Sequence, residues 1–593
     1  MDIDYKVASS AAKALLKLYS SNISVDSIQV QETKREFEGD ITVVVFPFLK
    51  MSKTSPEITA TALGELIAKD LEEVIGFNVV KGFLNLEIAN SYWIQFLNNV
   101  LDKPSYGFKE RNSENEVMVE YSSPNTNKPL HLGHLRNNFL GYSVAKILEA
   151  NGHKVQKVQI INDRGIHICK SMISWKNYGE GETPETSGLK GDKLVGKYYV
   201  KFDQVYKSQV AALIEEGSDK ETAEKNAPII DEARELLQKW ENKDPETRAL
   251  WEMMNSWVYK GFEHTYREMG VTFDKLYYES NTYLNGKDEI EKGLNSGVLF
   301  KKDDGSVWCD LTQDGLDEKL VLRGDGTAVY MTQDIGTAIL RYQDYPDLAY
   351  QIYTVGNEQE YHFKVLFLIL DKLGFSKAKS NYHLSYGMVE LPEGKMKSRE
   401  GTVVDADDLL EEMIATAKSI SETQGKLSDL SEEEKADTFK KIGYGALKYF
   451  LLKVDPRKGM MFNPEESVDF QGNTGPFIQY TYVRAKAVIK KAGKVVKPTM
   501  TNLLLSPAEK KVIKTLHDYP SVIQEAAKLY NPGVLSNYIF ELVKDYNSFY
   551  QSTNILKEEN LDLVDFRLNF SSLTARVIHS GMKLLGIDMP EKM

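Results

Sequence analysis

The distribution of hydrophobic and polar residues changes twice along the chain and predicts three regions. Residues 1–112 mix a helical spacing of apolar residues with strand-like runs at 41–46 and 83–88. Residues 113–410 contain short apolar runs that alternate with amphipathic segments, the pattern of β–α–β units. Amphipathic helical segments dominate residues 411–593. We therefore expect an N-terminal α+β module, an α/β domain and a C-terminal all-α helical bundle.

The middle region repeats the β–α–β pattern and predicts a doubly wound parallel sheet of Rossmann type. The first set is a strand at 117–121, a helix at 132–148 and a strand at 155–161. The second set is a strand at 329–332, a helix from about 336, a strand at 350–355, a helix at 363–373 and a strand at 382–391. Residues 176–260 are polar and helical, so we expect a helical insertion between the two sets. The C-terminal helices are expected at 436–454, 474–492, 507–530, 533–552 and 565–585.

Composition narrows the class of protein. A chain of 593 residues exceeds what one hydrophobic core organises, which agrees with several domains. Its longest apolar stretches fall far short of the roughly 18 residues that a membrane span requires, so no membrane association is expected. Asp2 and Asp4 at the start fit neither a signal peptide nor a transit peptide. The two cysteines, Cys169 and Cys309, suit a reduced, cytoplasmic protein and cannot form a zinc cluster.

A first motif joins the predicted strand at 117–121 to the helix that follows it. His131, Gly133 and His134 stand at the start of that helix, so both imidazoles lie on one face of its first turn. A helix N-terminus offers unpaired N–H groups and positive potential to a triphosphate, and the glycine allows a ligand to approach the backbone. The two histidines could then donate hydrogen bonds to phosphate oxygens in a transition state. Taken alone, the motif indicates adenylyl transfer.

A second motif is a basic loop between two glycines, Gly394-Lys395-Met396-Lys397-Ser398-Arg399-Glu400-Gly401. It follows the last predicted strand of the second set. Three cations between glycines suit a loop that closes over phosphates. In isolation such a loop is more often a solvated surface turn, but its place after the nucleotide fold favours the functional interpretation.

Together these motifs resemble those of class I aminoacyl-tRNA synthetases, whose HIGH motif is similar to residues 131–134 and whose KMSKS loop is similar to residues 395–399. Longer strings resemble the arginyl family in particular. They are the stretches 120–136, 162–167, 325–334, 355–363 and 472–480. The sequence departs from the pattern at Ser398, where KMSKS has Lys, and at Gln333, where the family commonly has Arg. Lys395 is our first choice for the working lysine of the loop and Lys397 the second.

The resemblance implies a set of site residues. The catalytic residues would be His131, Gly133, His134, Lys395 and Lys397. The arginine pocket would be formed by Glu120, Asn125, Glu279, Tyr330, Asp334 and Gln359. ATP would be held by His131, His134, Gly356, His362 and Lys395, with no metal bound tightly by the protein. A buried carboxylate such as Asp334 can accept the planar guanidinium in bidentate fashion, which supports this pocket on chemical grounds.

The expected function is ATP-dependent activation of L-arginine and its transfer to the 3′ end of tRNA(Arg), with Mg²⁺ carried by ATP. The resemblance also implies that bound tRNA assists activation. Residues 1–112 and 411–593 would bind tRNA, the second region at the anticodon. No pattern specifies the oligomeric state, and a monomer is the default expectation.

Other functions stay open at this level. A class I synthetase for cysteine would need zinc ligands, and one for glutamate would need Arg where Asp334 and Glu279 stand. A catalytically silent tRNA-binding paralogue would have no chemical reason to keep His131, His134 and Lys395.

Overall fold

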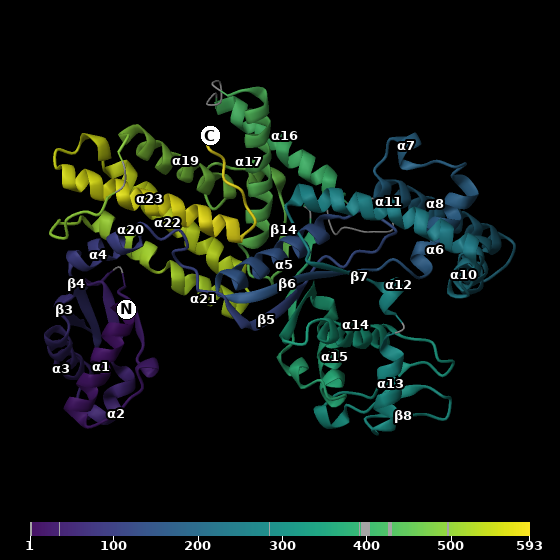
Figure 1. Cartoon of the computed structure of the whole chain (residues 1–593), viewed down its shortest axis with the longest axis horizontal. Helices are drawn as coiled ribbons and strands as arrows, with labels where there is room; N and C mark the ends of the chain where they lie inside the picture. Colours follow the sequence, from purple (N-terminus) through teal and green to yellow (C-terminus); the bar gives the residue numbers. More distant parts are fainter. Residues whose placement is uncertain are drawn as a thin grey trace. The chain divides into compact units, whose positions relative to one another are not determined.

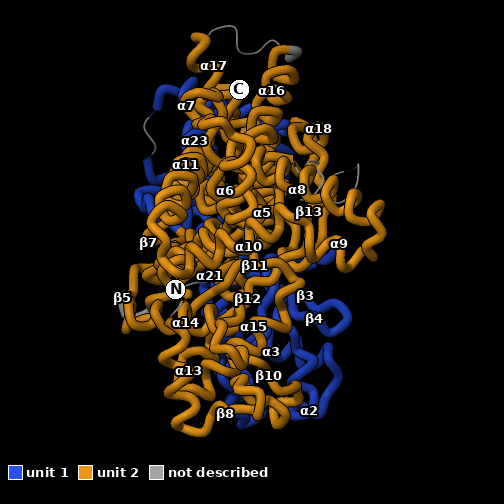
Figure 2. The backbone as a smooth tube through the Cα atoms, turned by 90° about the vertical axis from the view of Figure 1, so that its right-hand side faces the viewer, with its two compact units in different colours: residues 1–106, 485–518, 544–575 blue, residues 107–484, 519–543, 576–593 orange. Residues whose placement is uncertain are grey.

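The computed structural model describes residues 3–34, 36–283, 285–390, 392, 404–424, 430–494 and 497–593. The backbone forms two compact units, each assembled from several stretches of chain (Figure 2). Unit 1 consists of residues 1–106, 485–518 and 544–575, and unit 2 of residues 107–484, 519–543 and 576–593. None of the helices found in the described residues is long and apolar enough to span a membrane.

A five-stranded parallel sheet forms the centre of unit 2. Its strands are β5 (Asn112–Glu120), β6 (His153–Ile161), β7 (Lys275–Tyr278), β11 (Leu348–Gly356) and β12 (Tyr382–Tyr386). They lie in the order β12-β11-β5-β6-β7. The chain therefore starts in the middle, moves outward to β7 and then returns to the other side of β5. This confirms the predicted doubly wound fold, and it places the topological switch point between β5 and β11, where such sheets bind ligands.

Helices cover both faces of this sheet. On one face α5 (Leu132–Ala150) approaches β5 so closely that a side chain at Gly141 would collide with Tyr121. On the other face Met118 packs beside Leu340 of α14 (Tyr330–Asp344). The α14 side continues into a larger core with β11 and with α15 (Glu360–Lys372). Successive side chains of β5 thus point to opposite faces of the sheet, one set toward α5 and the other toward α14.

The predicted strand at 329–332 is wrong, because α14 begins at Tyr330. The Thr332 hydroxyl accepts a hydrogen bond from Val329 N (3.0 Å) and donates one to the carbonyl of Val321. This arrangement stabilises a first helical turn in a segment whose apolar run is typical of a strand. A small antiparallel sheet of β8 (Leu299–Lys301), β9 (Val307–Cys309) and β10 (Lys319–Leu322) precedes α14, together with α13 (Asn285–Asn295).

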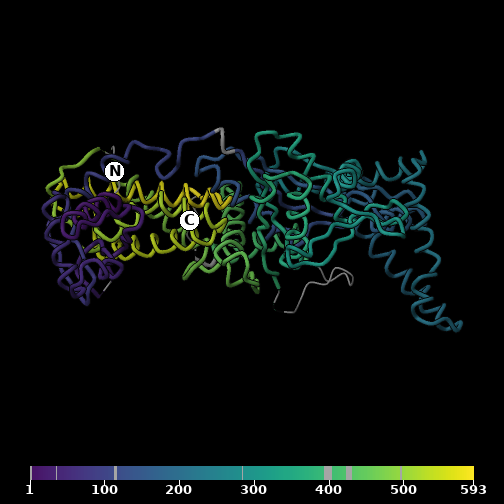
Figure 3. The backbone as a smooth tube through the Cα atoms, turned by 90° about the horizontal axis from the view of Figure 1, so that it is seen from below, coloured from purple at the N-terminus to yellow at the C-terminus, as the bar shows by residue number. Residues whose placement is uncertain are grey.

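The insertion between β6 and β7 is helical, as predicted. It contains α6 (Ile166–Tyr178), α7 (Pro184–Ser187), α8 (Gly191–Glu215), α9 (Lys220–Asn226), α10 (Pro228–Glu241) and α11 (Pro245–Met269). Figures 1 and 3 show these helices gathered on one side of unit 2 instead of along the sheet. They pack mainly on one another, with α8 against α6 and α11.

Unit 1 contains an antiparallel sheet of β1 (Val30–Glu32), β2 (Ile41–Val44), β4 (Phe83–Ile88) and β3 (Val74–Val80). The sheet is accompanied by α1 (Ile3–Tyr19), α3 (Pro56–Asp70) and α4 (Asn90–Val100). C-terminal segments complete the unit, since Asn98 exchanges two hydrogen bonds with the backbone of Thr499 (2.8 and 3.0 Å). The predicted α+β module therefore packs with segments distant in sequence.

The C-terminal region is helical, and its main helices are α16 (Ala406–Gln424), α17 (Glu432–Leu452), α19 (Gly475–Ala492), α20 (Pro507–His517), α21 (Tyr519–Leu529), α22 (Pro532–Ser552) and α23 (Leu561–Leu584). The single helix predicted at 507–530 is wrong, because α20 and α21 are separated at Asp518. Pro520 lacks the backbone N–H that would continue the first helix. One short strand also occurs in this region, β14 (Met460–Met461), which pairs in parallel with β13 (Val389–Glu390).

Candidate active site

The candidate site lies at the carboxyl ends of the parallel strands, where the loop after β5 meets the loop after β6. Asn125 and Asn162 form a bridge between the two loops. Thr126 N donates to Asn162 O (3.1 Å), and Asn162 N donates to Pro124 O (2.9 Å). Two stretches singled out in the sequence, 120–136 and 162–167, are therefore held side by side.

The turn that leads from β5 toward the first motif has an unusual backbone. Ser122 and Ser123 both have positive φ angles, 81° and 44°. Two asparagines of α5 hold this turn, since Asn137 Oδ1 accepts from Ser122 N (2.6 Å) and Asn138 Nδ2 donates to Ser122 Oγ (3.1 Å). Strained backbone of this kind persists where surrounding contacts hold it in place, and it is common at functional sites. Sequence reasoning missed these asparagines, although their spacing of three and four residues from His134 places them on the same side of the helix.

The structure brings His131 and His134 together at the start of α5, as the motif predicts. Their ring centroids are 3.9 Å apart. His131 N donates a hydrogen bond to His134 Nδ1 (3.2 Å). Gly133 keeps this turn open, because a Cβ there would lie 3.1 Å from the His131 ring. A residue larger than glycine would press on the first histidine.

Both rings are neutral at pH 7. Burial, followed by the nearby Lys128, lowers the pKa of His131 to about 3. Burial, together with His131 and Lys128, places the pKa of His134 well below its usual value. Because Nδ1 of His134 accepts a hydrogen bond, its proton resides on Nε2. The two side chains can therefore act as neutral hydrogen-bond donors.

Lys128 is a candidate that sequence reasoning missed. It lines a cavity of about 230 Å³ with His131, Lys193, Lys197 and Tyr199. Burial lowers the pKa of Lys128, and it forms no ion pair with any residue that the structure describes. An amine close to the two histidines of the first motif would suit the negative charge of a nucleotide phosphate. The only sequence feature that pointed to Lys128 was its position three residues before His131 of the first motif.

The second motif, with Lys395 and Lys397, lies outside the described residues, but the segments that flank it contact the first motif. After the loop, Ala406 N donates to Leu130 O (2.9 Å) and Leu132 N to Val404 O (3.4 Å). Before the loop, the buried Arg136 of α5 donates to the carbonyl of Gly387 (2.8 Å). The described segments on the two sides of the second motif are thus hydrogen-bonded to the first motif and to α5.

Arg136 makes further hydrogen bonds that were not predicted. Its guanidinium also donates to the carbonyls of Met388 (3.3 Å), Pro456 (3.1 Å) and Lys458 (2.8 Å). The side chain is 1% exposed. Burial lowers the pKa of this guanidinium to about 10, against the smaller opposing effects of Tyr386 and Asp455. It therefore stays charged at neutral pH and links the two backbone segments that lead into β13 and β14.

A cavity of about 560 Å³ adjoins the linked loops and is lined by four of the six residues predicted for the arginine pocket. They are Asn125, Glu279, Tyr330 and Asp334. Asn125 comes from the loop after β5 and Glu279 from the first turn of α12 (Glu279–Thr282), whereas Tyr330 and Asp334 belong to the first turns of α14. The cavity therefore joins residues that lie more than 200 positions apart.

The predicted burial of Asp334 is wrong in this structure. Its side chain is 42% exposed and makes a 2.6 Å hydrogen bond with Nε2 of His362. Tyr330 is 80% exposed. Both residues stand in the first turns of α14 and line the cavity. His362, which was predicted to bind ATP, here contacts the predicted arginine pocket.

Glu279 lies deeper in the cavity, beside charged residues of the loop after β6. Arg164 Nη1 lies 3.7 Å from its carboxylate. Burial raises the pKa of Glu279 to about 7; Arg164 opposes this shift, and the neighbouring Asp163 and Asp334 add to it. Asp163 is itself held by Ser280, next to Glu279, through two hydrogen bonds of 2.7 and 2.8 Å. The charge of Glu279 therefore changes near neutral pH.

Two predicted arginine-binding residues do not line the cavity. Glu120 ends β5 beneath it, and its carboxylate forms a buried ion pair with Arg341. Gln359 is exposed in the turn η4 (Asn357–Gln359). Gly356, predicted to bind ATP, is buried at the end of β11, one residue before that turn.

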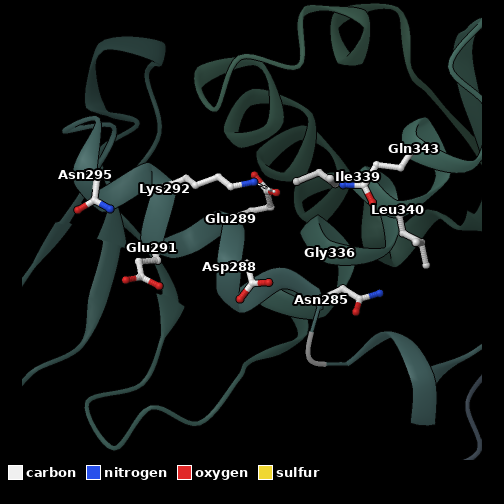
Figure 4. Close-up of a pocket in the computed structure, with 10 residues that line it drawn as sticks. All are labelled: Asn285, Asp288, Glu289, Glu291, Lys292, Asn295, Gly336, Ile339, Leu340 and Gln343. Carbon is white, nitrogen blue, oxygen red and sulfur yellow. Dashed lines mark hydrogen bonds and ion pairs between the residues drawn. The ribbon is translucent and has the colours of Figure 1, made fainter.

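A second cavity lies on a neighbouring face of α14 (Figure 4). It has a volume of about 480 Å³ and lies between α13 and the Gly336, Ile339, Leu340 and Gln343 face of α14. Its acids come from α13, where Glu289 pairs with Lys292 (2.6 Å). It contains none of the predicted site residues, so this face of α14 is not part of the candidate site.

Comparisons with known proteins identify the family of the chain. Residues 96–463 match the family model for class I tRNA synthetases (R), catalytic domain, and residues 478–593 match the DALR anticodon binding domain. The chain is 57% identical to an arginine–tRNA ligase of Bacteroides fragilis over all of both chains. It is 58% identical to that of Flavobacterium psychrophilum, covering 96% of this chain and 97% of the relative.

Solved structures show the same fold at lower identity. The arginyl-tRNA synthetase of Thermus thermophilus superposes with a TM-score of 0.80 at 24% identity, and 99% of each chain is covered. The five-stranded parallel core, the antiparallel N-terminal sheet and the helical C-terminal region all fit this likeness. On the matching family models and the full-length relatives, the chain belongs to the class I arginine–tRNA ligase family.

Proposed function

We propose that the arginine–tRNA ligase reaction of this family takes place at the carboxyl end of the parallel sheet, with ATP at the start of α5 and arginine in the 560 Å³ cavity. The observation that carries this proposal is the gathering of Glu279, Tyr330 and Asp334 around one cavity at the carboxyl ends of β5, β6 and β7. Glu279 and Asp334 bring two carboxylates from separate elements to this cavity, which Arg164 and Arg323 also line, and carboxylates placed in this way can accept a guanidinium.

On the nucleotide side, the proposed groups are His131 and His134, with Lys128 beside them and Lys395 or Lys397 from the second motif. Neutral imidazoles can donate hydrogen bonds to the α- and β-phosphates without the cost of placing a buried charge. Gly356 and His362 are proposed as further contacts for ATP, because they adjoin the carboxyl end of β11. Mg²⁺ would arrive with the triphosphate and would neutralise part of its charge.

On the amino-acid side, Asp334 is proposed to accept the guanidinium and Tyr330 to lie beside it. Glu279 and Glu120 would receive the α-ammonium, with Asn125 near the carboxylate and Gln359 at the rim. The observed exposure of Asp334 implies that arginine itself completes the burial of this carboxylate. A lysine ammonium cannot match the forked guanidinium and citrulline has no charge, so both should bind poorly.

In the first proposed step, a carboxylate oxygen of arginine attacks the α-phosphorus of ATP. Pyrophosphate leaves, and arginyl-adenylate remains. In the second step, a terminal ribose hydroxyl of tRNA attacks the carbonyl carbon of this mixed anhydride, an ester forms and AMP leaves. The residues position the reactants and stabilise charge, and no covalent enzyme intermediate is needed.

The regions outside the catalytic centre are proposed to bind tRNA. We assign tRNA contact to residues 1–112, catalysis to 113–410 with the insertion at 176–260, and anticodon binding to 411–593. The match of residues 478–593 to an anticodon binding domain supports the last assignment. We also propose a cytoplasmic location and a monomeric state.

Exchange of radiolabelled pyrophosphate into ATP tests the proposed site. The purified chain is assayed with arginine, lysine, citrulline or glutamate, with and without unfractionated tRNA. We expect exchange with arginine alone and an increase when tRNA is added. Equal exchange with lysine would refute the proposed specificity of the acidic cavity.

A further inference from the structure

The inference concerns a buried ion pair beneath the proposed arginine site, between Glu120 of β5 and Arg341 of α14. The Arg341 side chain is 1% exposed and that of Glu120 8% exposed. A buried charge without a partner is strongly unfavourable, so each of these residues requires the other. The Arg341 guanidinium also lies over the rings of Tyr277 (5.1 Å) and Tyr353 (5.6 Å), which restrict where it can move.

The location of the pair links it to the site. Tyr330, Asp334, Thr337 and Arg341 lie at intervals of four, three and four residues, so they form one stripe along α14. The first three line the 560 Å³ cavity, and Arg341 continues the stripe inward to Glu120. Glu120 is the last residue of the central strand, and only Tyr121 separates it from the two residues with positive φ angles.

The two oxygens of Glu120 have different partners. Oε2 binds Arg341, whereas Oε1 accepts a hydrogen bond from Ser123 Oγ (3.0 Å). A carboxylate oxygen can accept two hydrogen bonds, so Oε1 retains capacity for one more. Arg341 Nε and Nη2 are buried and have no hydrogen-bond partner among the described residues. The guanidinium is therefore committed to Glu120, and the carboxylate is held in one orientation.

We propose that Arg341 is a positioning residue for arginine activation, which fixes the Glu120 carboxylate so that Oε1 faces the substrate's α-ammonium. This inference rests on the proposed function, in which Glu120 contacts arginine. Arg341 itself would touch neither arginine nor ATP. It would act only through Glu120, and that restriction makes the proposal testable.

The test is a double-mutant cycle on the full chain with Arg341→Met, Glu120→Gln and the combination, read out as KM for arginine, KM for ATP, kcat and Tm. We expect each single variant to raise KM for arginine by about tenfold or more, with KM for ATP changed less than about twofold. Because Arg341 acts through Glu120, the combined variant should match Glu120→Gln, so the two increases should not multiply.

Thermal stability should differ from KM in this respect, because the combined variant should be more stable than Arg341→Met. Arg341→Met leaves the Glu120 charge buried alone and should lower Tm, whereas the combined variant removes both charges and should recover it. Arg341→Lys keeps a cation and should restore part of the arginine affinity. Lys275→Met is the matched control, since Lys275 pairs with Asp344 at the other end of α14 (2.6 Å) and should leave KM for arginine unchanged.

Two outcomes would overturn this inference and leave the proposed function intact. In the first, Glu120→Gln raises KM for arginine but Arg341→Met does not. In the second, the two increases in KM multiply in the combined variant. If Glu120→Gln itself leaves KM unchanged, the placement of Glu120 in the proposed arginine site fails as well. Should Arg341→Met not fold, Arg341→Lys and the combined variant still decide between these outcomes.

Discussion

The two halves of the candidate site differ in how they handle charge. On the proposed nucleotide side, His131 and His134 are partly buried, adjacent and neutral, and both stand at the N-terminus of α5. On the arginine side, Glu279 and Asp334 come from separate helices, and Asp334 is half open to solvent. The proposed nucleotide half is thus largely preformed. The proposed arginine half contains carboxylates that a bound ligand would neutralise. Under the proposed placement of the substrates, ATP would meet groups that are already positioned, and bound arginine would cover the exposed carboxylate of Asp334.

The largest expected effect tests the rigid half. His134→Ala removes a partly buried donor that would act on the phosphates in the transition state, so kcat for adenylate formation should fall about 10²- to 10³-fold. KM for arginine should change little, because the acidic cavity is separate. Pyrophosphate exchange at saturating arginine measures the loss.

The exposed His264 of the insertion provides the control. His264→Ala should retain full exchange activity. A His134→Ala enzyme with normal kcat would show that the first motif does not contact the reacting phosphate, and the comparison between the two halves would lose its basis.

The next effect tests the half that the ligand completes. Asp334→Asn should weaken arginine binding by about 3 kcal/mol, roughly 100-fold in KM, because the guanidinium loses a charged, bidentate acceptor. KM for ATP should stay near the wild-type value. Steady-state kinetics with arginine and ATP varied in turn separate the two.

Asp371→Asn is the matched control, since Asp371 pairs with Lys379 at the far end of α15 (3.3 Å). If Asp334→Asn and Asp371→Asn have equal KM values for arginine, the guanidinium binds elsewhere.

The two halves also differ in how much of them the sequence could predict. His131, Gly133 and His134 form a local pattern at a helix start, and the structure brings them together as predicted. Glu120 was predicted to form part of the arginine pocket, but it does not line the cavity and is paired with Arg341, 221 positions away along the chain. Local patterns reveal residues that one element brings together. They cannot show which distant cation neutralises a buried acid.

The same reasoning explains the errors in the fold. The doubly wound order follows from alternating strands and helices, and the structure confirms it. The segment at 329–332 has the apolar run of a strand, yet hydrogen bonds of Thr332 with Val329 and Val321 start a helix there. Those contacts depend on β10, which the pattern did not predict. The domain boundaries and the individual site roles stay predictions.

A third effect concerns Arg136, which links α5 to the backbone segments that lead into β13 and β14. Arg136→Lys replaces a planar guanidinium that binds four backbone carbonyls with an ammonium that has three donors. Unfolding free energy should fall by about 2 kcal/mol, because at least one buried carbonyl loses its donor. Chemical denaturation measures the change.

If Arg136 also fixes the approach to the second motif, KM for ATP should rise in Arg136→Lys while KM for arginine does not. Lys146→Met is a control on the same helix, since Lys146 makes only a partly exposed pair with Glu149 (2.6 Å). Equal changes in both KM values would indicate general loosening instead of a specific effect on the nucleotide side.

The smallest effect comes from the titration of Glu279, whose pKa of about 7 results first from burial. Below this pH the free enzyme carries a neutral carboxyl group, which must lose its proton before it can hold the α-ammonium. Arginine affinity should therefore increase as pH rises, and KM should fall about tenfold between pH 6 and pH 8. The histidines stay neutral over this range and should add no pH dependence to kcat, so the two halves should separate in a pH profile. Glu279→Gln should bind arginine more weakly and with a flat profile, whereas a slope that survives in this variant would assign the titration to another group.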